Sequence, residues 1–246
     1  MSRALFHAGD LLVRRGRASA ALPPGQRAIR AHPRYGSDGF SPDPVAPPSP
    51  SIEISGAGIV TARIDAAALS PLPRREIVAD FHCVAGWTTR DLRWEGVLLR
   101  DLYETLEPVP GTTHLRACGR DGFRAVLLLE DALAEDVLIA DRLDGAPLPL
   151  EHGGPWRLLS ATQYGYKSVK HLCRIELHAG EPSDRHLRPI TGVALGALGP
   201  HPRARVWQEE RHRHRPPQSI RWAVGPLLHP VIYTLNYLGA LRTRRR

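Results

Sequence analysis

Alternation of apolar and polar residues is the clearest pattern along the central part of the chain. Residues 51–56 read Ser-Ile-Glu-Ile-Ser-Gly, which places both isoleucines on one face of an extended strand. Apolar segments of strand length recur downstream, and turn-forming residues at 119–122 and 144–145 follow two of them. The pattern predicts strands at 51–56, 114–118, 123–129, 137–140, 156–161 and 169–177.

Helical spacing is confined to short segments. Residues 96–106 carry apolar side chains three and four positions apart and stop just before Pro108, which predicts an amphipathic helix. Residues 130–136 predict a short helical turn. Because strands and helices do not alternate as βαβ units, we expect an α+β fold, with a mixed β-sheet core and short peripheral helices.

The regular pattern occupies residues 51–180, which we take as the core domain. Residues 1–50 are expected to form an extended N-terminal strap that contributes to this domain, since five prolines fall within residues 41–50. Residues 181–246 lose the regular pattern and are expected to form a basic C-terminal tail. With 246 residues, 23 prolines and 22 glycines, the chain suits one strand-and-loop domain with extended ends.

Charge is distributed unevenly along the chain. Residues 1–36 carry a net charge of +6 and residues 201–246 a net charge of +8, whereas residues 37–200 carry −6. Basic ends on an acidic body differ from the basic face of a nucleic-acid-binding domain, so we expect no nucleic-acid partner. Solvated tails are the favoured interpretation, and peripheral membrane contact through the basic C-terminus is the alternative.

No segment has the pattern of a targeting signal or of a clean membrane span. The pair Arg14-Arg15 is not followed by a sustained apolar stretch. The apolar segment 223–241 is interrupted by two prolines, a histidine and an asparagine. We therefore expect a cytoplasmic protein.

One of the cysteines stands in an unusual setting. The three cysteines are too widely spaced for a disulfide framework or a zinc motif, and a lone cysteine is most often a small core residue. Cys83, however, precedes Gly86 and a pair of threonines, which places it at a strand end leading into a loop. Trp87 and Trp94 are near enough in sequence to wall a cavity beside it.

Two glycine-containing turns follow about seventy residues later. Residues 152–157, His-Gly-Gly-Pro-Trp-Arg, allow close approach of backbone to a ligand and place His152 and Arg157 across one turn. Residues 165–170, Gly-Tyr-Lys-Ser-Val-Lys, offer backbone N–H groups, a hydroxyl and the chain's two lysines, against 31 arginines elsewhere, and these groups could form a phosphate cradle. Taken alone, each motif is more typical of an ordinary turn, and neither has the spacing of a P-loop.

Together and in this order, the motifs resemble the catalytic domain of the sulfite oxidase superfamily of molybdopterin-dependent oxidoreductases. They are Cys-Val-Ala-Gly-Trp-Thr at 83–88, Trp-Glu-Gly-Val at 94–97, the Asp-Gly turn at 121–122 and the two glycine-containing turns. The resemblance covers roughly residues 50–178 and extends in particular to the bacterial stand-alone branch that includes the catalytic subunit of periplasmic methionine sulfoxide reductase. It implies the sulfite-oxidase-type molybdopterin-binding fold and a Mo-molybdopterin cofactor.

The resemblance also implies a role for each matching residue. The Cys83 thiolate is the implied catalytic residue and protein ligand to molybdenum. His152 stands where the reductase branch has asparagine, and Cys118 where it has threonine. The implied cofactor-binding residues are Tyr35, Cys118, His152, Arg157, Ser168, Val169 and Lys170.

The expected function is two-electron oxygen-atom transfer on a small-molecule substrate, with a redox partner that the sequence does not identify. Sulfite oxidases follow the ligand cysteine with an Asn-Arg-Arg run, whereas this chain has Gly-Trp-Thr-Thr at 86–89, so sulfite is not the expected substrate. A non-catalytic molybdopterin-binding or interaction module of the same fold is the alternative. A polyanion- or membrane-surface-binding protein is less favoured.

Overall fold

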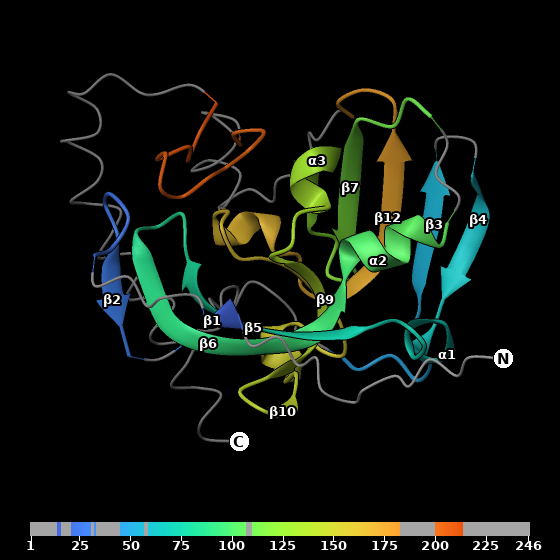
Figure 1. Ribbon diagram of the computed structural model, residues 1–246, viewed down its shortest axis with the longest axis horizontal. Coiled ribbons are helices and arrows are strands. Elements are labelled where there is room, and N and C mark those ends of the chain that lie inside the picture. The colour runs from blue at the N-terminus through green and yellow to red at the C-terminus, as the bar shows by residue number, and fades with distance from the viewer. Residues whose placement is uncertain are drawn as a thin grey trace, which may run out of the picture.

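The chain folds around two β-sheets that Figure 1 shows beside one another, the smaller one upright on the right. The computed structural model describes residues 14–15, 21–30, 32, 45–56, 59–106, 110–182 and 200–213. Tyr35 and the segment 223–241 lie outside these residues. Within the described part, no helix has both the length and the apolar character needed to cross a membrane.

Within the described residues, the larger sheet has seven strands, and its centre is a long antiparallel hairpin. The hairpin consists of β5 (Arg74–His82) and β6 (Trp87–Leu98), and β9 (Val137–Leu143) pairs antiparallel with β6. Two N-terminal strands add in parallel, one to each arm of the hairpin. The remaining strands are β1 (Arg14–Arg15) on β5, β2 (Arg27–Ile29) on β6, and β10 (Ala146–Pro147) and β11 (Arg157–Ser160) on β9.

The part of the chain that the structure describes gives the smaller sheet five strands, in the order β4-β3-β12-β7-β8. Only the pairing of β3 with β12 is parallel within this sheet as described. The alternation predicted for β3 is confirmed, because Ile52 and Ile54 are fully buried while Glu53 is exposed. The strands are β3 (Ile52–Gly56), β4 (Ile59–Ile64), β7 (His114–Gly119), β8 (Arg124–Leu128) and β12 (Leu172–His178).

The helices are short and connect the strands. Asp65 caps the first of them by accepting a 3.0 Å hydrogen bond from the Ala68 N–H, which satisfies one of the free donors of the first turn. They are α1 (Ala66–Leu69), α2 (Leu99–Glu104) and α3 (Leu129–Ala132), with two 3₁₀ turns, η1 (Leu150–His152) and η2 (Gly165–Lys167).

The helix expected at 96–106 begins later than the sequence pattern predicts. Residues 96–98 complete β6, where Gly96 pairs with Ala140 and Leu98 with Leu138 on β9. A side chain at position 96 would collide with the Ile139 carbonyl, so glycine permits this close strand approach. The three residues have an apolar pattern that suits a helix or a buried strand, and pairing with β9 decides between them.

The main hydrophobic core lies between the two sheets. It joins Ile54, Leu115 and Ile175 of the smaller sheet to Ile139 and Leu158 of the larger one. A second hydrophobic cluster, which includes Trp94 and Leu159, is formed by side chains of the larger sheet. All four residues of β11 are buried. The α+β class and the mixed pairing are confirmed, although the core consists of two sheets rather than one.

Residues 200–213 pack against the rest of the protein in a further hydrophobic cluster, although the sequence pattern places them in a tail. Ala204 and Val206 are fully buried against Tyr164. The backbone joins the two segments, because Tyr164 N–H donates to Ala204 O at 2.9 Å and Val206 N–H to Thr162 O at 3.1 Å. This segment is drawn in orange in Figure 1, near the loop of the β5–β6 hairpin.

Candidate functional site

Cys83 lies in the tight loop that joins β5 to β6, as the sequence predicts. Its N–H donates to Trp87 O at 2.8 Å, and the Gly86 N–H donates to Cys83 O at 3.0 Å, so the loop is a closed turn. The residue is 7% exposed. The Ala85 N–H points at Sγ from 3.5 Å, which places a backbone donor on the sulfur.

The surroundings of Cys83 oppose and assist its ionisation at the same time. Burial raises the pKa of the thiol to about 11, while the Ala85 N–H and the positive charges of Arg211 and Lys170 act to lower it. The thiol is therefore protonated at neutral pH when no metal is bound. A metal ligand must be the thiolate, so metal binding at Cys83 would release this proton.

Arg157 is a buried cation without an acidic partner in the described part of the chain. It is 1% exposed, and its pKa is lowered by burial to about 9, so it stays charged at neutral pH. Its Nη1 donates to His152 O at 2.9 Å and its Nη2 to Ser168 O at 3.1 Å. Its Nε has no hydrogen-bond partner among the described residues. A buried charge of this kind is costly unless an anion pairs with it.

Aromatic rings surround the Arg157 guanidinium. Its Cζ lies 5.2 Å from the ring centre of Phe81 and 5.1 Å from that of Trp94, which is within the range of cation–π attraction. Phe81 in turn packs at 6.1 Å from Trp87. Both tryptophans that the sequence placed near Cys83 therefore belong to one aromatic cluster, and this cluster holds Arg157.

His32 joins the same cluster and was missed by the sequence reasoning. Its ring centre lies 4.7 Å from that of His152 and 4.9 Å from that of Phe81. Burial, followed by the charges of His152, Arg157 and Lys170, keeps the pKa of His32 well below its usual value, so the ring is neutral. A lone histidine in an irregular segment carries no periodic signal, and only the nearby position of Tyr35 hinted at a contact there.

The two glycine-containing turns lie side by side. Gly153 has a φ of 104°, and a Cβ at this position would lie 2.8 Å from the Cβ of Lys170. The backbone ties the turns together, because the His171 N–H donates to Gly153 O at 2.9 Å. Lys170 Nζ donates to Glu151 O at 2.9 Å, and its charge also acts on Cys83 and His32. Lys170, His152 and Arg157 are therefore brought together near Cys83.

Ser168 and Val169 turn their side chains into the protein. Ser168 Oγ accepts a 3.0 Å hydrogen bond from the Ser160 N–H, and the Val169 side chain is fully buried in the main core. The Leu158 N–H donates to Val169 O at 2.8 Å. A cofactor contact at these two residues would therefore be made by backbone.

The Cys118 thiol points to another part of the molecule. Its Sγ lies 3.9 Å from Glu176 Oε1, and burial, followed by the Glu176 charge, raises the pKa of this thiol. The backbone beyond Cys118 does approach the candidate site, since the Arg120 N–H donates to His171 O at 3.0 Å. Tyr35 is outside the described residues, so its implied contact stays a prediction.

Comparison with known proteins decides the family. Residues 41–186 match the family model of the oxidoreductase molybdopterin-binding domain, which covers more than half of the chain. The chain belongs to this family.

Individual relatives agree with the assignment. An uncharacterized oxidoreductase of Bacillus subtilis, YuiH, is 35% identical over 122 residues, which are 47% of this chain and 62% of the relative. The methionine-sulfoxide reductase catalytic subunit MsrP of Gluconobacter oxydans is 28% identical over 171 residues, 62% of this chain and 53% of the relative. The chain thus spans less than two thirds of the length of these curated relatives.

A solved structure supports the fold alone. The sulfane dehydrogenase SoxCD of Paracoccus pantotrophus aligns with a TM-score of 0.51 at 22% identity, over 55% of this chain and 40% of that one. The sulfite-oxidase-type molybdopterin-binding fold expected from the sequence is thereby confirmed.

Lys167 does not face the candidate site of this molybdopterin-binding domain. The motif at 165–170 predicts that its ammonium group belongs to a phosphate cradle, but the residue is 2% exposed. Its Nζ donates to the carbonyls of Val126 and Pro202, the latter at 2.9 Å. Lys167 therefore links the edge strand β8 to the segment 200–213. The carbonyls of Val126 and Pro202 are removed from water, and the ammonium group supplies the hydrogen-bond donor that they need.

Replacing Lys167 with methionine is expected to lower the free energy of unfolding by about 2 kcal/mol, since two buried carbonyls lose a charged donor. Urea denaturation of the cofactor-free protein measures this change. Lys170→Met is the matched control and should cost clearly less, because the Lys170 contact with Glu151 O is exposed. Equal losses for the two variants would contradict the structural role of Lys167.

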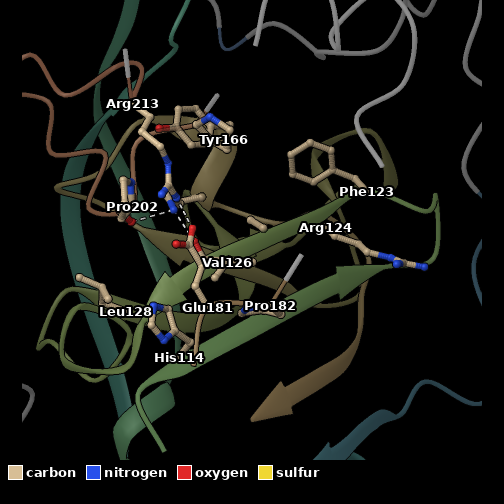
Figure 2. A pocket seen from close by; sticks show the side chains of 13 residues that line it. His114, Phe123, Arg124, Val126, Leu128, Tyr166, Glu181, Pro182, Pro202 and Arg213 are labelled. Carbon is tan, nitrogen blue, oxygen red and sulfur yellow. Dashed lines mark hydrogen bonds and ion pairs between the residues drawn. The ribbon is translucent and has the colours of Figure 1, made fainter. Parts of the chain in front are cut away.

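A cavity of about 150 Å³ lies apart from the candidate site. Figure 2 shows it beside β8, with Phe123 and Tyr166 on its walls and an ion pair between Arg213 and Glu181 across it. Neither Cys83 nor Arg157 lines this cavity. The residues that carry the family's motifs are instead clustered where the strap, the β5–β6 loop and the two glycine-containing turns meet.

Proposed function

We propose that this chain binds a molybdenum–molybdopterin cofactor and carries out two-electron oxygen-atom transfer on a small substrate. The observation that carries the proposal is the Arg157 guanidinium, which is 1% exposed and has an Nε without a partner in the described structure. A phosphate on the cofactor would supply the missing anion through charge-assisted hydrogen bonds. Family membership supports a molybdopterin-type ligand.

The residues present fit such a cofactor. Cys83 offers a thiolate, which suits a soft, redox-active metal, and Arg157 and Lys170 offer positive charge to a phosphate. His152 contributes a neighbouring imidazole. The implied contacts at 168–169 rest on the resemblance, because both carbonyls and the Ser168 N–H already have partners within the protein. When bound, the cofactor supplies the electron and oxygen-atom chemistry. The protein orients it, excludes water by burial and balances its charge.

Sulfoxides are the first substrate class that we propose. Relatives named as methionine-sulfoxide reductase catalytic subunits support this choice. The Gly-Trp-Thr-Thr run at 86–89, which lacks the cationic run of sulfite oxidases, counts against sulfite. A redox partner and a cytoplasmic location belong to the same proposal.

Metal analysis combined with a substrate screen tests the function. Purified or reconstituted protein should contain stoichiometric molybdenum and oxidise a reduced viologen dye when a sulfoxide is added, with N-oxides as comparison substrates. Sulfite, which gives up two electrons when it becomes sulfate, is tested separately with an oxidised dye as the electron acceptor. Bound cofactor without turnover on any of these would favour the non-catalytic alternative. Protein that binds neither molybdenum nor pterin under these conditions would overturn the proposal.

A further inference from the structure

The loop that carries Cys83 is held from outside by two remote parts of the chain. Gln26 Nε2 donates to Cys83 O at 3.1 Å, and the Arg27 N–H donates to Gly86 O at 3.0 Å. On the other side, Arg211 Nη1 donates to Val84 O at 2.8 Å. The loop therefore depends on partners more than fifty residues before it and more than a hundred residues after it.

Arg211 connects these two remote parts with each other. Its Nη2 donates to Pro24 O at 3.0 Å while its Nη1 holds the Val84 carbonyl, so one guanidinium bridges the N-terminal segment and the loop. Its Cζ also lies 5.2 Å from the ring centre of Tyr164, which precedes η2. A planar, permanently charged fork can make these contacts at once, whereas a lysine ammonium provides only a point charge.

The segment that carries Arg211 is itself well anchored. Arg205 pairs with Glu210 at 2.7 Å, and the Arg211 N–H donates to Glu209 O at 2.9 Å. Tyr166 Oη donates to Arg211 O at 3.2 Å. The guanidinium is thus presented from a fixed backbone, which is needed if it is to hold another loop in place.

We propose that Arg211 is a positioning residue for Cys83, fixing the loop between β5 and β6 so that the thiolate is aimed at the metal. This inference rests on the proposed function, because the position of Cys83 matters to chemistry only when a metal is bound.

Removing the guanidinium would release the carbonyls of Val84 and Pro24 and so loosen the middle of the loop, while the hydrogen bonds from Gln26 and Arg27 would still hold its two ends. The Cys83 side chain would then sample more orientations. The sulfur-to-metal charge-transfer absorption depends on the orientation of the sulfur relative to the metal, so this band reports directly on positioning. A residue that only stabilised the overall fold would leave the band of correctly folded, loaded protein unchanged.

The test compares Arg211→Gln and Arg211→Lys with Arg213→Gln. Arg213 lies in the same segment but pairs with Glu181 in an exposed position, so it serves as the matched control. In cofactor-free protein, we expect amide hydrogen exchange of residues 83–87 to be about tenfold faster in Arg211→Gln and unchanged in the control. In loaded protein, the charge-transfer band should shift and molybdenum should be retained less well. Arg211→Lys should give intermediate values.

The two levels of the hypothesis fail in different ways. Unchanged exchange at 83–87 in both Arg211 variants would overturn the positioning role, whatever the metal content. A wild-type protein without molybdenum would overturn the proposed function, while the exchange data would still measure the restraint on the loop. If Arg211→Gln does not fold, Arg211→Lys and the control decide the matter, and identical spectra and exchange for these two would contradict the role.

Discussion

Cys83→Ser is expected to reduce oxygen-atom transfer by roughly a thousandfold or more while leaving the fold intact. A serine hydroxyl is nearly isosteric with the thiol, but it is a hard and weakly acidic group that does not replace a thiolate on a redox-active metal. Because the thiol is neutral and its main contact is a 3.5 Å approach of the Ala85 N–H, the free energy of unfolding should change by only about 1 kcal/mol. Dye-linked turnover, molybdenum content and the charge-transfer band measure the effect together.

Cys173→Ser is the matched control for this variant. Cys173 is partly exposed, and its Sγ lies 3.5 Å from Cys118 O on the smaller sheet. The control should keep its metal, its spectrum and its turnover. Full molybdenum occupancy with an unaltered charge-transfer band in Cys83→Ser would remove Cys83 as the metal ligand.

Arg157→Gln is expected to weaken cofactor binding by at least about a hundredfold, because each charge-assisted hydrogen bond to a phosphate contributes roughly 1.5–3 kcal/mol. The cofactor-free protein should be affected much less. It loses donors to His152 O and Ser168 O, but it is also relieved of a buried charge without an acidic partner in the described structure. Molybdenum and pterin content after gel filtration measure the retained cofactor.

A simple anion provides an independent measurement of the same site. Pyrophosphate should raise the melting temperature of cofactor-free wild-type protein, since a ligand that binds only the folded state stabilises it, and it should have little effect on Arg157→Gln. Arg93→Gln is the control, because Arg93 is exposed and lies 3.6 Å from Glu76. An equal response to pyrophosphate in wild type and Arg157→Gln would show that Arg157 does not bind the anion.

Local features of the fold were predictable because they depend on nearby residues. The alternation of Ile52 and Ile54 marks a half-buried strand. A turn was also expected at 144–145, and there Asp144 and Gly145 have φ values of 51° and 78°. The start of α2 was predicted wrongly, because the apolar pattern of residues 96–98 is compatible with a helix and with a buried strand. The local sequence pattern also could not predict the number of sheets, since that number depends on which strands pair with one another.

The residues of the candidate site were likewise predictable in part. Sequence motifs identified Cys83, His152, Arg157 and Lys170 as a set, and the structure brings these residues together. The same motifs also suggested a cradle with two ammonium groups, and the structure assigns one of them, that of Lys167, to buried carbonyls instead. The direction of a side chain depends on the residues that pack beside it. The spacing of residues along the chain does not specify these neighbours.

By itself, the sequence determined the family, the order of its motifs and the identity of the thiol and cations available for chemistry. Only the tertiary structure decided that Arg157 is buried without an acidic partner among the described residues, that His32 joins its aromatic surroundings and that Arg211 reaches the Cys83 loop. These features arise from contacts between residues far apart in the chain. Burial and pairing are properties of the space around a side chain, whereas the sequence specifies only which side chains are present to fill it.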